Sequence, residues 1–470
     1  MNTARFLWDE LESVVAGEWL LPPSTSKAGV RGVIDDSRFV SAGALFVAVR
    51  GELADGHKYM VQAAQAGATA VCVERISEEQ QTILAELGVA CLRAGDGLVA
   101  LQALARAHRR RFKDLVLVGI TGSCGKTSTK EMIAAVLEQR WRGAVLKTEG
   151  NTNNHFGVPR NLLRLTNGHR AAVIEMGSNH PGEIALLAAL AEPTLGVVSN
   201  IGHAHLEFFG DLAGVACEKG DILAGTASDG PVVLPTEAAS LETLKEKAGA
   251  RRVLCFGSGT ESDIRVRYEG LGDDGAYGVR LQWRDSGEER LLHWSLGGAH
   301  QALNAGAAAA VGTALGIAPD SIVAGLSACR LPGMRMAIHE LAGAHWVNDA
   351  YNANPDSMRA GVRWFAELTK RVPRSALVLV VGDMLELGHD GQDEHASLLS
   401  WLAGELPGAT VVPVGSLMCA AACGAGLEGY ADVEAAASRV AELAGEGSWV
   451  FLKGSRGIAL ESLIPAEPSR

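Results

Sequence analysis

The sequence predicts a three-domain α/β protein. A small N-terminal α/β domain is followed by a central domain with a mostly parallel sheet and added antiparallel strands, and by a C-terminal Rossmann-like α/β domain. The chain has 470 residues, which at ~100–200 residues per domain favours about three domains. Short apolar runs alternate with helical patterns along most of the chain, as expected where helices connect parallel strands.

Residues 1–95 are expected to form the N-terminal domain. Apolar runs bounded by glycine-rich turns predict strands over Gly43–Val49, Ala68–Val73 and Val89–Leu92. A helical pattern over Lys58–Ala66 lies between the first two of these strands. This order of elements indicates a small α/β unit.

Residues 96–316 are expected to form the central domain. It begins with a helix over Leu98–Arg111, and the basic run 109–111 at its end is typical of a solvated helix terminus. Residues 261–296 alternate in character between Gly/Asp turns and predict antiparallel strands, after which an Ala-rich helix covers His300–Leu315. The strands expected in the parallel part are Leu115–Ile120, Ala171–Met176, Leu195–Ile201, Pro231–Leu234 and Arg251–Phe256.

Strand–helix alternation restarts after Ile317, so residues 317–470 are expected to form the third domain. We find no internal repeat, low-complexity tract or coiled-coil heptad in the chain. The strands expected here are His345–Asn348, Leu377–Val381, Thr410–Val414 and Trp449–Leu452.

Charge and composition restrict the function classes. The net charge of −12 argues against a general nucleic-acid binder, although a local pocket can still be basic. The N-terminus lacks a basic-then-apolar signal pattern, and no apolar run approaches the ~18–20 residues of a membrane span. We therefore expect a cytoplasmic monomer that is not embedded in a membrane. The eight cysteines form no C-x-x-C pair and are expected to be reduced, mostly buried thiols.

The segment 118–129, VGITGSCGKTST, indicates a phosphate-binding loop between a strand and a helix. Gly122 and Gly125 allow backbone N–H groups to point at one phosphate cluster, and the helix N-terminus adds partial positive charge. Lys126 offers a cation to the β- and γ-phosphates, and the Thr127 hydroxyl suits Mg²⁺. The sequence therefore predicts binding of a nucleotide with Mg²⁺ in a central domain like that of P-loop ATPases. The residues expected to contact the nucleotide are Gly122, Ser123, Cys124, Gly125, Lys126, Thr127 and Ser128.

Two positions of this segment, Ile120 and Cys124, carry residues that need a separate interpretation. The general G-x-x-x-x-G-K-[ST] pattern has glycine where Ile120 stands in this chain. Cys124 is interpreted as a small side chain that fills the loop, with a low-pKa thiol at the helix N-terminus as the alternative.

Polar side chains also follow the next predicted strands. Glu175 ends one of them, where a carboxylate beside a phosphate loop is well placed for Mg²⁺. His203 and His205 follow another and share one side of an extended segment. Taken alone, each histidine favours a hydrogen-bonded structural role over a role as metal ligand.

The TG-x-x-GKT form of the loop resembles the ATP-dependent Mur ligase superfamily, which includes the peptidoglycan amino-acid ligases and folylpolyglutamate synthase. The run His205-Leu206-Glu207, with Lys219 fourteen residues after the histidine, matches a motif of this family. The resemblance implies that Thr127 binds one Mg²⁺, that Glu175 and His205 bind a second, and that Lys219 is carried as an anionic carbamate. An ordinary helix lysine is the alternative at position 219.

Further segments extend the resemblance. The family pattern N-x-x-G-x-P implies that Asn154 lies near the γ-phosphate, and H-x-x-x-N implies that Asn304 contacts the adenine. Arg335 would approach the phosphates, where it offsets charge that develops in phosphoryl transfer, and Asp349 would bind the ATP ribose. Turn formation and helix capping are the structural alternatives for the Asn and Asp positions.

Residues 36–59, EMGSNHPGEI, NDAYNANPDSM and VVGDMLELG resemble the branch of the family that joins D-alanyl-D-alanine to UDP-N-acetylmuramoyl-tripeptide. The resemblance implies uridine-nucleotide binding by domain 1–95, ATP binding by 96–316, and acceptor-dipeptide binding with closure over ATP by 317–470. A sister ligase (for the third peptide residue, or for folate) and a P-loop kinase remain as alternatives. The substrate-binding residues it implies are Ser37, Arg38, Asn352, Asn354, Lys453 and Arg456.

The resemblance also implies a mechanism. The tripeptide carboxylate would attack the ATP γ-phosphate and give an acyl phosphate, which the dipeptide amine would then attack. The residues expected to act in catalysis are Lys126, Lys219, His205 and Arg335.

Overall fold

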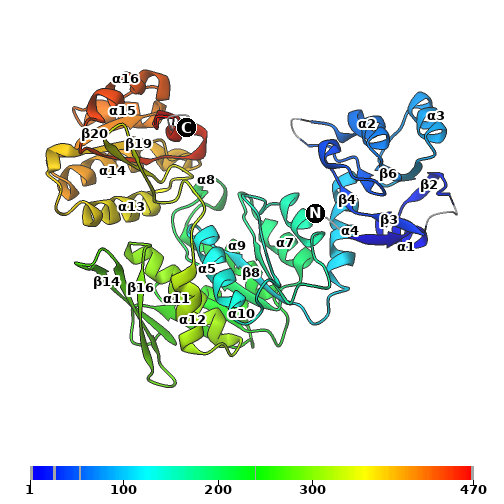
Figure 1. Ribbon diagram of the computed structural model, residues 1–470, viewed down its shortest axis with the longest axis horizontal. Coiled ribbons are helices and arrows are strands. Elements are labelled where there is room, and N and C mark those ends of the chain that lie inside the picture. The colour runs from blue at the N-terminus through cyan, green and yellow to red at the C-terminus, as the bar shows by residue number, and fades with distance from the viewer. Residues whose placement is uncertain (1–3, 25–27, 52–53, 239, 467–470) are drawn as a thin grey trace.

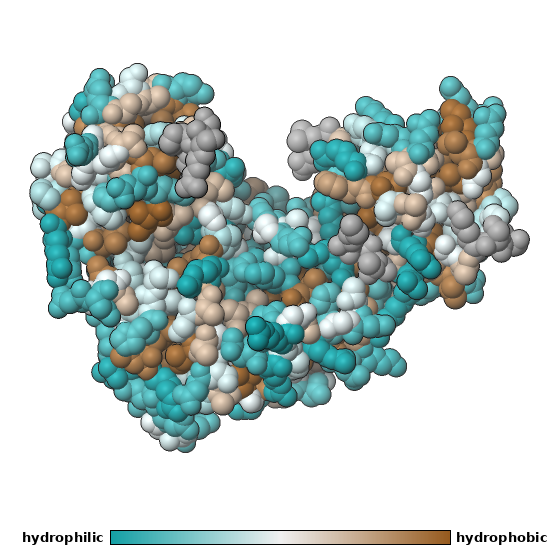
Figure 2. Space-filling model, viewed as in Figure 1, coloured by the Kyte–Doolittle hydropathy of each residue, from teal (hydrophilic) through white to brown (hydrophobic). Residues whose placement is uncertain are grey.

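The computed structural model describes residues 4–24, 28–51, 54–238 and 240–466. Positions 52 and 53 of the resembling segment 36–59 lie outside this part of the chain. Three lobes follow one another in Figure 1, with the central lobe between the N-terminal and C-terminal ones. A wide notch separates the two outer lobes on the face shown in Figure 2.

The N-terminal lobe holds a small mixed sheet in the order β2-β7-β6-β5-β4, and β1 pairs separately with β3. Strands β4 to β7 run parallel and β2 is antiparallel to β7. Its strands are β1 (Arg5–Leu7), β2 (Glu18–Leu21), β3 (Gly29–Arg31), β4 (Val33–Ile34), β5 (Leu45–Val47), β6 (Ala70–Val73) and β7 (Ala90–Arg93). Its helices are α1 (Trp8–Val15), η1 (Ser37–Phe39), η2 (Gly56–Tyr59), α2 (Met60–Gln65) and α3 (Glu78–Glu86). Helix α4 (Gly97–Arg109) then leads into the central lobe.

The central lobe is built on a large sheet in the order β16-β15-β14-β13-β12-β11-β8-β10-β9. The strands from β9 to β14 along the sheet are parallel, and β14, β15 and β16 form an antiparallel extension. Its strands are β8 (Val116–Thr121), β9 (Val145–Lys147), β10 (Ala171–Glu175), β11 (Leu195–Val198), β12 (Val232–Pro235), β13 (Val253–Gly257), β14 (Ile264–Leu271), β15 (Tyr277–Trp283) and β16 (Glu289–Trp294).

Helices cover both faces of this sheet. The buried side chains form two apolar clusters. One cluster is shared with the N-terminal lobe through α4, and the other is closed by α5, α11 and α12. The helices are α5 (Lys126–Glu138), α6 (Gly157–Leu162), α7 (Glu183–Ala191), α8 (Leu206–Phe209), α9 (Leu212–Ala224), α10 (Leu241–Ala248), α11 (Ala299–Ala314) and α12 (Pro319–Ala328).

The C-terminal lobe has a sheet in the order β17-β18-β21-β19-β20, in which only the edge strand β17 is antiparallel among the described residues. Its strands are β17 (Ala337–Leu341), β18 (Ala344–Asn348), β19 (Leu377–Gly382), β20 (Thr410–Val414) and β21 (Trp449–Lys453). Its helices are α13 (Pro355–Leu368), η3 (Arg374–Ala376), η4 (Gly388–Asp390), α14 (Gly391–Glu405), α15 (Ser416–Gly424), α16 (Val433–Leu443), η5 (Arg456–Ile458) and η6 (Leu460–Leu463).

The predicted fold class is therefore confirmed, including the antiparallel strands within 261–296. The sequence patterns missed strands β1 to β4, β9 and β17. All of them are five residues or shorter, and β17 is a half-exposed edge strand with no apolar run. In the part of the chain that the structure describes, no helix has the length and apolar character needed to cross a bilayer.

Two expectations need correction. All eight cysteines are free, but three are buried, three are half-buried and two are exposed, so they are not mostly buried. The basic end of α4 is not simply solvated either, since Arg109 is only 5% exposed. Its guanidinium donates to the carbonyls of Ala191 (2.9 Å), Glu192 (3.0 Å) and Phe112 (2.9 Å). The C-terminal carbonyls of α7 lack helical partners, and Arg109 satisfies them.

Replacing Arg109 with methionine should lower the free energy of unfolding by about 3 kcal/mol, because one buried and two partly buried carbonyls lose a charged donor. The matched control is Arg110→Met, whose exposed guanidinium binds the Glu192 carboxylate at 2.6 Å and should contribute less than about 1 kcal/mol. Chemical denaturation of both variants measures the difference. Equal destabilisation would contradict the structural role assigned to Arg109.

The C-terminal lobe is held against the central lobe by polar contacts of α13. The Glu367 carboxylate accepts from Tyr268 Oη at 2.6 Å and from the Leu271 amide at 2.7 Å. Trp364 Nε1 donates to Tyr277 Oη at 3.0 Å. These contacts place the carboxyl ends of the C-terminal strands opposite the phosphate loop.

Candidate active site

The loop between β8 and α5 requires glycine at two positions. Gly122 has φ +149°, and a Cβ there would lie 2.1 Å from Ser199 Oγ. Gly125 has φ +74°, and a Cβ there would lie 2.6 Å from Asn304 Oδ1. Both conformations are rare for other residues and both contacts are too short for a side chain. The glycines therefore fix the loop at the N-terminus of α5.

Lys126 is the first residue of α5 and bends back over the loop. Its Nζ donates to the Gly122 carbonyl at 2.7 Å and to the Ser123 carbonyl at 3.4 Å. Burial lowers the pKa of Lys126, while the nearby Glu175 carboxylate opposes this change. The ammonium thus lies where the loop amides converge, as phosphate binding requires.

Cys124 is held by the residue that follows the neighbouring strand β11. Its amide donates to Asn200 Oδ1 at 2.8 Å, and Asn200 Nδ2 donates to its Sγ at 2.8 Å. Burial raises the pKa of the Cys124 thiol, so the low-pKa alternative is wrong. The thiol instead fills the loop, as the first interpretation of the sequence states.

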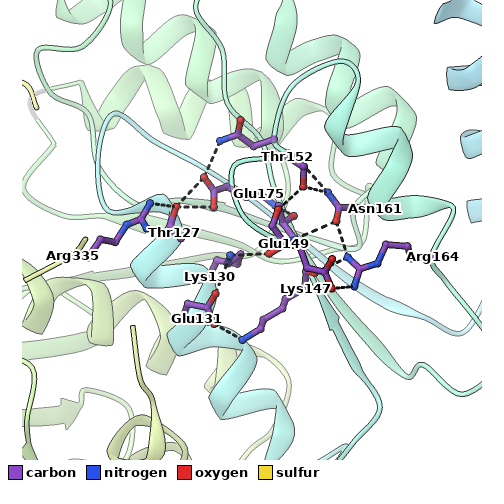
Figure 3. A network of polar contacts seen from close by, with 12 residues as sticks. Thr127, Lys130, Glu131, Lys147, Glu149, Thr152, Asn161, Arg164, Glu175 and Arg335 are labelled. Atoms are coloured by element: carbon purple, nitrogen blue, oxygen red, sulfur yellow. Dashed lines mark hydrogen bonds and ion pairs between the residues drawn. The ribbon is translucent and has the colours of Figure 1, made fainter. Parts of the chain in front are cut away.

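Glu175 forms the polar centre of the site and is 1% exposed. Its carboxylate accepts from Thr127 Oγ1 at 3.0 and 3.2 Å and from Asn153 Nδ2 at 2.9 Å. Figure 3 shows Thr127 between Glu175 and Arg335, whose Nη2 donates to Thr127 Oγ1 at 3.1 Å. The parallel register places Glu175 opposite Ile120, so this carboxylate and the phosphate loop share one edge of the sheet.

These donors suit a hard divalent cation. A hydroxyl and a carboxylate are ligands that Mg²⁺ prefers, and Mg²⁺ in phosphate sites takes its remaining ligands from phosphate and water. The described residues contain no cluster of three or more His, Cys, Asp or Glu that could hold a metal alone. Thr127 and Glu175 fit an Mg²⁺ that arrives with a nucleotide.

The segment before α6 contains two neighbouring asparagines, Asn153 and Asn154, whose side chains make different contacts. Asn154 Oδ1 accepts from the amides of Phe156 (3.2 Å) and Gly157 (2.9 Å), which is turn chemistry at the start of the helix. Asn153 is the residue whose side chain reaches Glu175. The sequence run GNTNN offers several asparagines, and its pattern does not distinguish them.

The two histidines after β11 face the C-terminal lobe. The His203 amide and Nδ1 lie 3.0 and 3.2 Å from Asp356 Oδ2. His205 Nδ1 lies 2.8 Å from Glu386 Oε2, and this contact lowers the pKa of Glu386. His205 (φ +53°) and Glu386 (φ +68°) are both left-handed non-glycine residues, a strained conformation that often occurs at functional sites.

Lys219 on α9 is 1% exposed and lies behind the cavity wall. Its Nζ donates to Ser178 Oγ at 2.7 Å and lies 5.3 Å from the centre of the Phe209 ring. Burial, helped by repulsion from Lys126, lowers the pKa of Lys219 to about 7. This residue is therefore not the exposed helix lysine of the alternative interpretation.

Three charged residues of the C-terminal lobe form a linked set. Asp349 Oδ2 lies 2.6 Å from Lys453 Nζ, and Asp349 Oδ1 accepts from the Met336 amide at 3.3 Å. Arg335 lies between two left-handed residues, Met334 (φ +60°) and Met336 (φ +56°), and its guanidinium stacks 3.8 Å from the centre of the Tyr351 ring. Asp349 thus helps to position the segment that carries Arg335 toward Thr127.

The start of α11 contributes the last predicted contact. Asn304 Nδ2 donates to Gln301 Oε1 at 3.0 Å, and its Oδ1 lies beside Gly125. Burial lowers the pKa of His300 to about 4, so its imidazole is neutral at physiological pH.

The central and C-terminal lobes enclose a cavity of about 670 Å³. Its wall contains most of the residues singled out in the sequence. These are Ser123, Cys124, Gly125, Lys126, Thr127, Ser128, Asn154, Glu175, His205, Asn304, Arg335, Asp349, Asn352, Asn354 and Lys453. Two more, Gly122 and Lys219, contact wall residues from behind.

Three predicted residues lie away from this cavity. Ser37 donates to Gln62 at 3.3 Å, and Arg38 binds Asp36 at 2.6 Å with its side chain 77% exposed on the N-terminal lobe. The Arg456 guanidinium contacts Glu461 and the sulfur of Met334. Of the two asparagines near the start of α13, Asn354 caps that helix by accepting from the Ser357 amide at 2.8 Å.

Several wall residues escaped the sequence analysis. Asn153, Ser178 and Asn200 each follow a strand of the parallel sheet. This position after a strand end could have marked them as candidate site residues. Glu386 lies in the segment VVGDMLELG that carries part of the family resemblance, but no local pattern indicates its contact with His205, which only the docking of the C-terminal lobe produces.

A glycine loop between a strand and a helix, with a lysine and a buried carboxylate at one sheet edge, defines a P-loop nucleotide-binding protein. Family models extend this to the whole chain. The Mur ligase middle domain matches residues 120–312, the glutamate ligase domain of Mur ligases matches 334–456, and the Mur ligase family catalytic domain matches 30–109. The chain belongs to the Mur ligase family.

Individual relatives support this assignment. The UDP-N-acetylmuramoyl-tripeptide–D-alanyl-D-alanine ligase of Bacillus subtilis is 33% identical over 95% of this chain and 94% of its own. That of Escherichia coli is 36% identical, over 92% and 93%. The crystal structure of MurF from Acinetobacter baumannii matches with a TM-score of 0.88 and 30% identity, over 98% of both chains. MurF ligase from Thermotoga maritima in complex with ADP matches with a TM-score of 0.78 and 28% identity, over 92% and 95%.

Proposed function

We propose that this chain is an ATP-dependent, ADP-forming ligase that joins D-alanyl-D-alanine to UDP-N-acetylmuramoyl-tripeptide. One observation carries the proposal: the cavity in which the phosphate loop and Glu175 face Arg335 and Lys453 of the C-terminal lobe. It is supported by the full-length relatives that bear this activity in their names. Each lobe then has a role: 1–95 binds the uridine nucleotide, 96–316 binds ATP, and 317–470 binds the acceptor and closes over ATP.

ATP binds with its phosphates on the loop before α5. The loop amides and Lys126 hold the β- and γ-phosphates, and Arg335 approaches from the other lobe to offset charge during phosphoryl transfer. Asn304 lies beside Gly125 and takes the adenine, and Asp349 takes the ribose. Asn154 stays near the γ-phosphate through its place in the cavity wall.

Mg²⁺ is the proposed metal. Thr127 would hold one Mg²⁺, and Glu175 and His205 would hold a second. When bound, Mg²⁺ neutralises charge on the transferred phosphoryl group.

The chemistry takes two steps. The tripeptide carboxylate attacks the γ-phosphorus of ATP, which releases ADP and leaves an acyl phosphate on the tripeptide. The neutral amine of D-alanyl-D-alanine then attacks the acyl carbon, and the tetrahedral intermediate expels phosphate as the amide bond forms. Contacts between the lobes, such as His203 with Asp356, hold the C-terminal lobe against the ATP site. Exclusion of water on closure of the lobes would protect the acyl phosphate from hydrolysis.

Lys219 is proposed to act as a carbamate. A lysine with a lowered pKa has a large neutral fraction near pH 7, and the neutral amine is the form that reacts with CO₂. The resulting anion would balance the positive charge of Lys126, whose ammonium now repels that of Lys219.

The substrates approach from two sides. Ser37 and Arg38 on the N-terminal lobe are proposed to contact the uridine nucleotide. Asn352, Asn354, Lys453 and Arg456 are proposed to contact the peptide substrates. The enzyme is proposed to act as a cytoplasmic monomer. Phosphate release that requires the tripeptide nucleotide, the dipeptide and ATP together tests the proposal, and it separates this enzyme from a sister ligase or a kinase.

A further inference from the structure

We propose that Lys130 is a positioning residue for the metal-binding carboxylate, acting through the end of strand β9. This inference rests on the proposed function, because it concerns how the chain places Glu175 for Mg²⁺. Lys130 belongs to none of the sets considered above: it neither lines the cavity nor touches the loop glycines.

The first observation is the burial of a cation with defined partners. Lys130 is 1% exposed, and an ammonium so deeply buried needs partners for its charge and its protons. Its Nζ donates to the Thr148 carbonyl at 2.8 Å and lies 3.0 Å from Glu131 Oε1. Glu131 also binds the Lys147 ammonium, whose side chain is 48% exposed.

The second observation is what Thr148 does next. Its amide donates to the Val173 carbonyl at 3.0 Å, and its Oγ1 accepts from the Glu175 amide at 2.9 Å. Thr148 therefore bonds to Val173 and Glu175 at the C-terminal end of strand β10. These bonds fix the backbone from which the Glu175 carboxylate extends. Lys130 holds Thr148 from the opposite side.

The third observation links the same segment to Asn153. The chain from Thr148 runs into the loop whose Asn153 side chain donates to Glu175 Oε1, and the Asn153 carbonyl accepts from the Gly177 amide at 2.9 Å. Thr127 and Lys130 lie three residues apart, on one face of α5. Thr127 contacts the Glu175 carboxylate, and Lys130 donates to the Thr148 carbonyl. Figure 3 shows Thr127, Lys130 and Glu175 close together.

The variant Lys130→Met tests this inference, because methionine has a similar length and no donor. Glu131 keeps its Lys147 partner, so the change falls mainly on Thr148. The matched control is Lys147→Met, which removes the other cation of Glu131 and leaves the Lys130–Thr148 bond intact. We expect Lys130→Met to weaken Mn²⁺ binding to the enzyme–ADP complex by about 10–100-fold, as for other groups that orient metal ligands.

Two titrations give the readout. Mn²⁺ is titrated into enzyme plus ADP, followed by electron paramagnetic resonance of the free ion, and ADP is titrated without metal in EDTA by calorimetry. For Lys130→Met we expect weaker Mn²⁺ binding with unchanged metal-free ADP affinity, and for Lys147→Met both affinities should match the wild type. Wild-type Mn²⁺ binding by Lys130→Met, equal loss of metal-free ADP binding, or the same loss in Lys147→Met would each overturn the inference.

A second variant covers the case in which Lys130→Met does not fold. Thr148→Val removes the acceptor of the Glu175 amide and should also weaken Mn²⁺ binding without changing metal-free ADP affinity. Normal Mn²⁺ binding by Thr148→Val would overturn the inference. If the wild-type enzyme itself binds no Mn²⁺ in the presence of ADP, the proposed function fails together with it. Normal wild-type binding combined with normal binding by the variants refutes the role of Lys130 alone.

Discussion

Replacing Lys126 with alanine should lower kcat for ATP-dependent ligation by about 10²–10³-fold, the usual cost of removing one preorganised group that stabilises transition-state charge. The ammonium lies at the centre of the phosphate loop, 2.7 Å from the Gly122 carbonyl. On the opposite side, Arg335 contributes a second cation through Thr127. The residual activity should therefore depend on Arg335.

Steady-state phosphate release measures this effect, and thermal unfolding shows whether the variant is folded. Lys245→Ala is a suitable control, because that lysine is 43% exposed and pairs with Glu242 in the same helix. Lys245→Ala should keep the wild-type rate. A folded Lys126→Ala enzyme with the full rate of ligation would contradict the assignment of the phosphate loop.

Lys219→Ala should reduce kcat by about 10–100-fold, the range found when a group that orients a metal-bound ligand is lost. The cause is the loss of a carbamate anion beside Lys126. Short-chain carboxylic acids such as acetate should restore part of the rate, because they can place a carboxylate in the space that the side chain leaves. Initial rates measured against acetate concentration give the test.

The matched control for this rescue is Lys219→Met. Methionine fills the same space beside Phe209 and Ser178, so carboxylic acids should not restore its activity. Rescue of Lys219→Met to the same extent as Lys219→Ala would show that the acid acts elsewhere. A Lys219→Ala enzyme with wild-type activity in the absence of acetate would contradict the carbamate proposal.

Much of the fold could be predicted from periodicity. The strands that carry the site are apolar and central, and β8, β10 and β11 lie within two residues of their expected bounds except at the C-terminal end of β11. That strand ends at Val198, three residues early, because Ser199 and Asn200 turn toward the phosphate loop. Arg109 could not be predicted in the same way. A basic cluster in the sequence indicates solvent exposure, and only the tertiary packing shows that Arg109 caps carbonyls at the end of α7.

The site residues that belong to one local sequence pattern could be predicted. The loop 122–128 and Glu175 are set by strand ends and helix starts, which sequence patterns report directly. The contact between His205 and Glu386 joins two lobes, so no local pattern could indicate it. Arg38 and Arg456 show the opposite case, since motif resemblance selected cations that contact Asp36 and Glu461 outside the cavity.

The cavity brings together cations from two lobes of an acidic chain. The net charge is −12, and Lys126, Arg335 and Lys453 line the cavity together with six carboxylates. A polyanionic nucleotide therefore needs the positive charge of its Mg²⁺ in addition to these side chains.

Phosphate release with systematic omission of substrates tests the central claim most directly. The complete mixture contains enzyme, ATP, Mg²⁺, UDP-N-acetylmuramoyl-tripeptide and D-alanyl-D-alanine, and mass spectrometry of the product accompanies the phosphate assay. We predict stoichiometric phosphate and the corresponding pentapeptide nucleotide only when every component is present, and no turnover when the dipeptide is replaced by a single amino acid or the nucleotide by a folate. Rapid phosphate transfer that needs no amine acceptor, or ligation of a different acceptor in preference to D-alanyl-D-alanine, would contradict it.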